Sequence, residues 1–93
     1  MNNDLASEIR SKVDIVDIIG ERIPLVAKGK NFFGVCPFHE DTNPSMSVSR
    51  EKQIYRCFSC GASGNVFNFL MNYDHKEFIE VLIDLGERVG LNT

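Results

Sequence analysis

Four potential metal ligands, spaced in two pairs, constrain the fold of this chain more than any other feature. Cys36 and His39 are separated by two residues, as are Cys57 and Cys60, and seventeen residues lie between the pairs. Two intervening residues let a tight turn present both side chains to one ion, and two such turns complete a tetrahedron. Three thiols and an imidazole favour zinc over calcium or magnesium. Because protein side chains fill all four positions, the sequence predicts one structural zinc ion.

Other uses of the cysteines remain open at this point. Buried cysteines often only fill space, and a Cys-x-x-Cys pair such as Cys57 and Cys60 also occurs in redox proteins. A sensor that releases its metal when these thiols are oxidised is a related alternative, as is iron in the same site. The chain has three cysteines, and an odd number argues against a closed set of disulfides. The Cys-x-x-His partner favours zinc.

The chain is short for a domain held together by apolar burial alone. It has 93 residues, and near this size a hydrophobic core supplies only a few kcal/mol of net stability. No stretch approaches the ~20 apolar residues of a membrane span, and residues 1–10 lack the apolar run of a signal peptide. We therefore expect one cytoplasmic domain, without a membrane partner, whose fold depends on zinc.

Hydrophobic periodicity and turn residues predict helices at both ends of the chain and strands between them. Asp14 suits the N-cap of a short second helix, Pro24 blocks a helix beyond it, and Asp74 with Glu77 resembles a capping box for the last helix. The expected helices are 5–13, 15–19, 66–71 and 78–89, and the expected strands are 22–26, 32–35, 46–48 and 53–57. The fold class is therefore α+β, a small antiparallel sheet flanked by N- and C-terminal helices. We expect a helical lead-in at 4–20, the sheet at 22–61 and a helical tail at 65–89.

The positive charge is concentrated around the metal ligands. The net charge of −3 divides into −2 over residues 1–20, +2 over 21–61 and −3 over 62–93. Aromatic residues interleave with the central bases, which is the minimum for stacking single-stranded bases and neutralising phosphates. Phe32 and Phe33 point to opposite faces of a strand, so one of them is offered to solvent or to a helix. From composition alone, aromatics packed under helices and bases that only solubilise a sheet edge are the favoured interpretation.

Several motifs together resemble the N-terminal zinc-binding domain of bacterial DNA primases, the CHC2-type zinc ribbon. They are Cys-Pro-x-His, a Pro-Ser in the loop that follows, Cys-Phe-x-Cys-Gly, and a later Gly-x-x-x-x-Phe. Their positions are Cys36, Pro37, His39, Pro44, Ser45, Cys57, Phe58, Cys60, Gly61, Gly64 and Phe69. The resemblance extends from about Ile9 to Val89. Met46 and Asn65 stand where the family commonly has phenylalanine and aspartate, and they keep the apolar bulk and the capping side chain.

The resemblance implies a zinc-ribbon fold that binds single-stranded DNA template and helps to select where RNA primers begin. It also implies that the chain is the first domain of a longer primase, a nucleotidyltransferase whose catalytic centre lies in a separate polymerase domain. The sequence has no acidic cluster suited to two-metal nucleotidyl transfer. The candidate DNA contacts are Lys28, Lys30, Asn31, Phe32, Lys52, Tyr55, Arg56 and Phe58. The alternative function is a protein-docking zinc module that contacts the primase polymerase domain or the replicative helicase.

Overall fold

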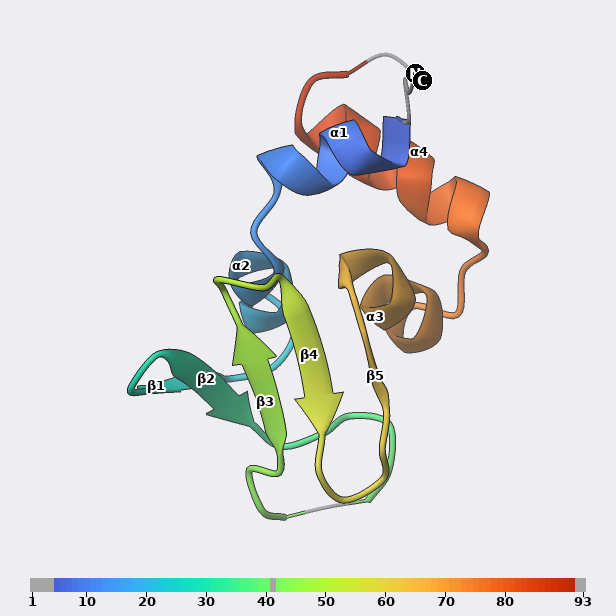
Figure 1. Cartoon of the computed structure of the whole chain (residues 1–93). Helices are drawn as coiled ribbons and strands as arrows, with labels where there is room; N and C mark the ends of the chain where they lie inside the picture. Colours follow the sequence, from blue (N-terminus) through green and yellow to red (C-terminus); the bar gives the residue numbers. More distant parts are fainter. Residues whose placement is uncertain (1–4, 41, 92–93) are drawn as a thin grey trace.

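The computed structural model describes residues 5–40 and 42–91 and confirms an α+β fold, with one antiparallel sheet and helices on either side of it in the sequence (Figure 1). Residue 4, the predicted start of the helical lead-in, lies outside the described residues. The elements in chain order are α1 (Leu5–Lys12), α2 (Ile15–Gly20), β1 (Val26–Lys28), β2 (Asn31–Gly34), β3 (Met46–Ser49), β4 (Ile54–Cys57), β5 (Ser63–Gly64), α3 (Val66–Tyr73) and α4 (Phe78–Arg88). No helix in the described part of the chain is long and apolar enough to span a membrane.

The sheet has the strand order β1-β2-β3-β4-β5, and every neighbouring pair is antiparallel. Gly29 has a φ of +64°, which opens the tight turn between β1 and β2. Cross-strand partners point to the same side of a sheet. The register therefore gives the sheet an inner side, which includes the pairs Met46–Cys57 and Val48–Tyr55, and an outer side. Helices α2 and α3 contact β3, β4 and β5 and cover the inner side.

The core lies between the inner side of the sheet and the helices. Its members are apolar residues that expose 6% or less of their surface, among them Ile9, Ile15, Ile18, Ile19, Met46, Val48, Tyr55, Phe67, Phe69, Leu70, Val81 and Leu85. The rings of Tyr55 and Phe69 meet edge to face with centroids 5.4 Å apart, and Phe38 lies 5.4 Å from Phe69. Because Phe38 belongs to the first ligand pair, the metal-binding loop is anchored in this aromatic core.

Helix α2 and the start of α3 form as the sequence predicts. The side chain of Asp14 accepts a hydrogen bond from the Val16 amide and caps α2. Asn65 does the same for α3, with bonds from the amides of Phe67 and Asn68.

Two predicted starts lie more than two residues from the observed ones, the other boundaries shift by one or two residues, and one short strand was not predicted. The strand expected at 22–26 begins only at Val26, because the amides of Arg22 and Ile23 both bond back to the Ile19 carbonyl at 2.9 Å and extend the turn of α2. Asp74 does not open the last helix. Its amide bonds to the Leu70 carbonyl at the end of α3, and α4 starts at a capping box formed by Glu77 and Glu80. The two-residue strand β5 is too short to give a sequence pattern.

Candidate metal centre

The four predicted ligands converge on one point of the structure. The ligand atoms of Cys36, His39, Cys57 and Cys60 all lie within 4.8 Å of one another. The sulfurs of Cys36 and Cys60 are 3.8 Å apart, and His39 Nε2 lies 3.4 Å from the Cys57 sulfur. A tetrahedral zinc with Zn–S bonds of about 2.3 Å requires sulfur–sulfur separations of about 3.8 Å. The donor set therefore fits one zinc ion, and these four residues are positioned to hold it.

Each ligand pair follows the end of a strand. Cys36 stands two residues after β2, and Cys57 is the last residue of β4. The chain turns tightly after Cys57, where the Gly61 amide donates to the Cys57 carbonyl at 3.0 Å. Gly61 has a φ of +81°, a conformation that residues with a Cβ rarely adopt. The backbone conformation at this position therefore explains the glycine of the Cys-Phe-x-Cys-Gly motif.

Neighbouring polar groups orient the ligands. His39 Nδ1 lies 3.1 Å from the Glu40 carbonyl, so a proton on Nδ1 can be donated there while Nε2 faces the sulfurs. Ser45 Oγ lies 3.6 Å from the Cys57 sulfur, and its carbonyl accepts from the Phe58 amide at 2.9 Å. The Pro-Ser loop is therefore tied to the second ligand pair.

The surroundings of the thiols act in opposite directions on their ionisation. Burial raises the pKa of the Cys36 thiol to about 12. Burial also opposes ionisation of Cys57, but hydrogen bonds from the Cys60 amide, the Ser45 hydroxyl and His39 outweigh it and lower its pKa to about 6. A bound cation would favour the thiolate form of Cys36. Cys60, in contrast, is exposed to solvent.

The outer side of the sheet presents a polar surface with basic and aromatic edges. One row of cross-strand partners runs Phe33, Ser47, Arg56 and Ser63, and the next runs Lys28, Asn31, Ser49 and Ile54. A groove of about 350 Å³ lies on this surface, and its lining includes Lys30, Asn31, Ser47, Ser49, Lys52, Arg56 and Phe58. Phe58 is 64% exposed, and the Arg56 guanidinium lies 5.5 Å from the centre of its ring. We call this region the outer sheet surface.

The structure separates the eight candidate DNA contacts into two groups. Six lie on the outer sheet surface or at its edge: Lys28, Lys30, Asn31, Lys52, Arg56 and Phe58. Phe32 and Tyr55 face the inner side of the sheet, away from that surface. Tyr55 is 1% exposed, and Phe32 pairs with Val48 and packs against the core.

Phe33 takes the place of Phe32 on the outer side. Alternation along the strand shows that one of these two phenylalanines faces outward. The pairing of Phe33 with Ser47, which lies on the outer side, shows that Phe33 is the one that faces outward. Ser47 and Ser49 are also outward-facing, and serines without a charge or ring gave no signal in the sequence.

Arg50 is one of the bases in segment 21–61, but its side chain pairs with residues of α2 and does not belong to the outer sheet surface. Its Nε donates to Asp14 at 2.7 Å, a second nitrogen lies 3.5 Å from Asp17, and its guanidinium stacks 5.0 Å from the Phe32 ring centre. Its charge is matched by acids of α2.

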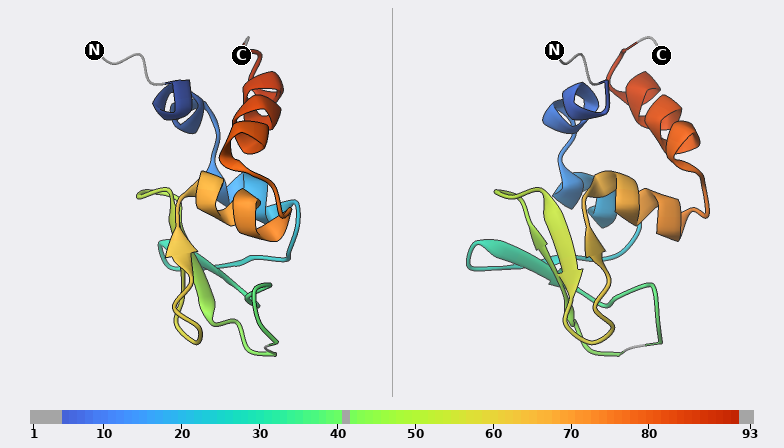
Figure 2. Two further views of the ribbon diagram at one scale, coloured as in Figure 1. Left: turned by 90° about the vertical axis from the view of Figure 1, so that its right-hand side faces the viewer. Right: turned by 45° about the vertical axis from the view of Figure 1, so that its right-hand side comes forward.

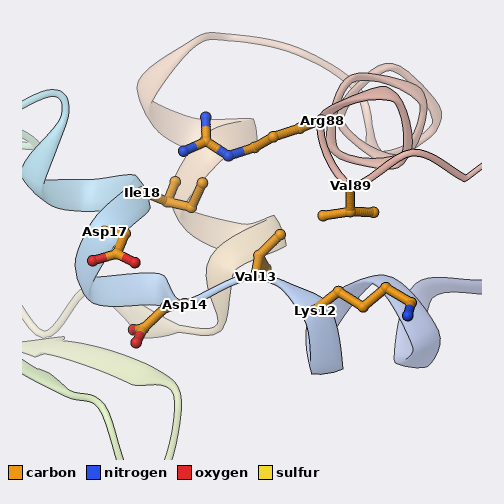
Figure 3. Close-up of a pocket in the computed structure, with 7 residues that line it drawn as sticks. All are labelled: Lys12, Val13, Asp14, Asp17, Ile18, Arg88 and Val89. Carbon is orange, nitrogen blue, oxygen red and sulfur yellow. The ribbon is translucent and has the colours of Figure 1, made fainter.

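A second hollow, of about 370 Å³, lies between α2 and α4 (Figure 3). Val13, Ile18 and Val89 form its apolar part, while the charged groups of Lys12, Asp14, Asp17 and Arg88 point in different directions (Figure 3). Arg50 engages both aspartates, and Arg88 pairs with Glu21. The described residues around this hollow offer no converging ligand set, so it is a gap between helices.

Comparison with known proteins gives one consistent result. The CHC2 zinc finger family matches residues 1–93. The DNA primase of Geobacillus stearothermophilus is 51% identical over 84 residues, which cover 90% of this chain and 14% of that protein. The DNA primase of Escherichia coli strain K12 is 49% identical over 87 residues, which cover 94% of this chain and 15% of that protein. The chain therefore spans about one seventh of the length of these relatives.

A solved structure has the same fold. The crystal structure of the Aquifex aeolicus primase, which contains zinc-binding and RNA polymerase domains, superposes with a TM-score of 0.92 at 39% sequence identity. The match covers 100% of this chain and 23% of that chain.

Proposed function

This chain belongs to the CHC2 zinc finger family as a zinc-binding domain of DNA primase, and from that premise we propose that it binds single-stranded template DNA and helps to select primer start sites. The observation that carries the proposal is the composition of the outer sheet surface. Bases, the exposed ring of Phe58, the half-buried ring of Phe33 and uncharged hydrogen-bonding groups occupy adjacent positions on one face, which is the combination that single-stranded nucleic acid requires.

Each kind of side chain on this surface has a distinct role in the proposal. Lys28, Lys30, Lys52 and Arg56 neutralise phosphates, which gives affinity without sequence preference. Phe33 and Phe58 offer ring faces to unstacked bases. Asn31, Ser47 and Ser49 supply donors and acceptors for base edges, so any preference for a start sequence depends on them.

Zinc has a structural role in this proposal. The bound ion fixes the loops that follow β2 and β4, and these loops position Phe58 beside Arg56. All four ligands come from the protein, so no position is left for an activated water.

The chain covers about one seventh of its primase relatives, so the chemistry of the whole protein is also a proposal. We infer that this is the first domain of a longer primase, in which a separate RNA polymerase domain makes the RNA primer during DNA replication. That domain is the expected protein partner, and the replicative helicase is an alternative one.

A DNA titration with charge-reversal variants tests template binding. The zinc-loaded chain is titrated with a fluorescent single-stranded oligonucleotide at several salt concentrations. Lys30→Glu combined with Lys52→Glu should weaken binding at least tenfold at low salt, because two phosphate contacts become repulsive. Four phosphate contacts predict a slope of about −3 for log affinity against log salt.

Arg10→Glu combined with Lys12→Glu is the matched control, because both are exposed bases on α1, outside the outer sheet surface, and the pair changes the net charge by the same amount. Equal weakening by both reversals would mean that only net charge matters and would contradict the proposed site. Tight binding that is insensitive to salt would contradict it as well.

A further inference from the structure

The groove on the outer sheet surface has two chemically different ends. Its volume is about 350 Å³, and its lining includes Lys30, Lys52 and Phe58. Lys30 directly precedes β2, and Lys52 lies in the turn between β3 and β4. Because Asn31 and Ser49 are cross-strand partners, both lysines stand just beyond the same terminal row of the sheet. This end of the groove therefore carries two ammonium groups.

The ring of Phe58 marks the other end of the groove. Phe58 follows Cys57, the last residue of β4, and is 64% exposed. Figure 2 shows the turn between β3 and β4 at one end of these two strands and the loop after β4 at the other. At about 3.4 Å per residue, the strand from Ile54 to Cys57 spans about 10 Å, and Lys52 and Phe58 lie beyond its two ends. The groove is therefore long enough for one extended nucleotide with its phosphates.

The middle of the groove carries one further base and several neutral polar groups. Arg56 pairs with Ser47 across the strands, and its guanidinium lies 5.5 Å from the centre of the Phe58 ring. Asn31 and Ser49 also line the groove. Hydroxyl and amide groups both donate and accept hydrogen bonds, which suits the hydroxyl groups of a ribose.

The bases of the groove are available to an anionic ligand. Within the described part of the chain, Lys30, Lys52 and Arg56 form no ion pair with a carboxylate. Glu51 is the acid in the described lining, so three bases stand against one acid. This excess of positive charge favours a ligand that carries several negative charges close together.

A triphosphate matches this distribution of charge more closely than a strand backbone does. A nucleic-acid strand carries one phosphate per nucleotide, spread along its length. A nucleoside triphosphate instead has three adjacent phosphates at one end and a base at the other. Lysine is a common phosphate ligand, and an exposed ring is a stacking surface for a base. The two lysines and Phe58 therefore stand where the two ends of such a molecule require them.

We propose that this groove binds the 5′-triphosphate end of an RNA primer, with the phosphates on Lys30 and Lys52 and the first base on Phe58. This inference rests on the proposed function, that the domain helps to select primer start sites. The first nucleotide of a new RNA chain keeps its triphosphate, because each later addition releases pyrophosphate from the incoming nucleotide and leaves the 5′ end unchanged. A triphosphate therefore distinguishes a newly started primer from other strands at this surface.

Template DNA has a neighbouring place on the same surface. A second hollow, of about 520 Å³, shares Arg56 and Phe58 with the groove and extends to Ser63 and Gly64 of β5. Its described lining contains no lysine. Without a primer, template phosphates use the lysines of the groove, and a primer end competes with the template for them.

Two RNAs that differ only at the 5′ end test this assignment. Fluorescence anisotropy of the zinc-loaded chain is measured with a 3′-labelled RNA tetranucleotide that carries either a 5′-triphosphate or a 5′-hydroxyl group, at constant salt. The triphosphate form should bind roughly tenfold more tightly or better, because its added charges contact the lysines. Equal affinities of the two RNAs would overturn the proposal.

Charge-neutralising variants test whether this preference arises in the groove. Lys30→Gln combined with Lys52→Gln should reduce the preference to about twofold or less. Arg10→Gln combined with Lys12→Gln is the matched control, because it removes the same charge from exposed positions of α1 and should leave the preference intact. A preference that survives loss of the groove lysines, or that falls equally in the control, would refute the site. Phe58→Ala should weaken both RNAs by similar factors, and unchanged affinities would contradict the placement of the base.

A parallel measurement separates this inference from template binding. The same chain is titrated with a single-stranded DNA oligonucleotide that has no triphosphate. If the DNA binds but the triphosphate adds nothing to the affinity for RNA, template binding stands and the primer-end proposal fails. If the triphosphate preference depends on Lys30 and Lys52 but the DNA does not bind, the primer-end proposal stands and template binding fails.

Discussion

Gly64 shows how one residue determines the local geometry at the start of α3. Its φ is +152°, and a Cβ at this position would lie 2.5 Å from the side-chain oxygen of Asn68. That oxygen accepts the Asn65 amide at 2.9 Å, and Asn65 caps the helix in return. Phe69, one turn further on, is fully buried in the aromatic core. The Gly-x-x-x-x-Phe motif therefore combines room for a helix cap with a core anchor.

Replacing Gly64 by alanine should destabilise the domain. The added methyl group strains the backbone and displaces Asn68 from the capping box, at a cost of about 1–3 kcal/mol. The measurement is chemical denaturation of the zinc-loaded chain followed by circular dichroism. Gly20→Ala is the control, because a Cβ there meets nothing within 4 Å and the φ is not positive. If the two variants are equally stable, this account of Gly64 is wrong.

At the residue scale, the sequence predicts ligands better than it predicts surfaces. Cys36 and Cys57 could be assigned because metal-ligand spacing is a local property of the chain. The inward direction of Phe32 and Tyr55 could not, because alternation gives two faces and only strand pairing decides which one the helices cover. The pairing of Arg50 with Asp14, 36 positions away, could not be predicted from the sequence either.

Helix α2 is the element that joins separate parts of the fold. Asp14 at its start bonds to Arg50 at 2.7 Å and to Gln53 at 3.3 Å, and Gln53 accepts the Ile15 amide at 2.8 Å. These bonds fasten the turn between β3 and β4 to the helix. Gln53 has a φ of +58°, a conformation that this set of side-chain bonds helps to hold. The sequence predicts the cap at Asp14 but gives no sign of its distant partners.

Asp14→Ala should cost about 1–2 kcal/mol, because the variant loses the N-cap and leaves Arg50 without its shortest ion pair. The turn that carries Lys52 should exchange its amide protons faster, as measured by NMR of the zinc-loaded chain. Asp17→Ala is the matched control. Its carboxylate is 64% exposed and lies 3.5 Å from Arg50, so its loss should change stability by less than about 0.5 kcal/mol. Equal effects of the two substitutions would show that the cap is unimportant.

Helix boundaries were less predictable than helix existence. The apolar stripe of α4 is a periodic signal over several turns, and the structure confirms the helix. The sequence predicts Asp74 as the cap of the last helix, but the structure places the N-cap at Glu77, three residues later. The hydrogen bond from the Asp74 amide to Leu70 settles the boundary through backbone geometry that local residue preferences do not encode.

We expect the stability of the whole molecule to depend on the metal, because its two ligand pairs close a long loop. The zinc site joins the end of β2 to the end of β4, and the aromatic core reaches into it through Phe38. Zinc binding in small domains contributes on the order of 10 kcal/mol, comparable to the total stability of such a fold. Outside the sheet, α4 is the element that we expect to keep some helicity without zinc, because its sequence is capped and amphipathic.

Removal of zinc by excess chelator should therefore abolish cooperative thermal unfolding, with residual helical signal from α4, and added zinc should restore the transition. Cys60→Ser should give the same state without chelator, whereas the neighbouring Ser59→Ala should bind zinc and melt normally. Circular dichroism and a colorimetric zinc assay report the two quantities. A cooperative transition that persists in chelator would contradict metal-dependent folding.

The length of α2 fixes how the β3–β4 turn and α4 are oriented relative to each other. The helix has six residues, with Asp14 holding the β3–β4 turn before its first residue and Glu21 holding Arg88 of α4 after its last. One inserted residue would rotate these two attachment points by about 100° and separate them by a further 1.5 Å or so. Both attachments could not then form together. The length of this short helix therefore sets the orientation of the outer sheet surface, which carries the proposed template site, relative to α4.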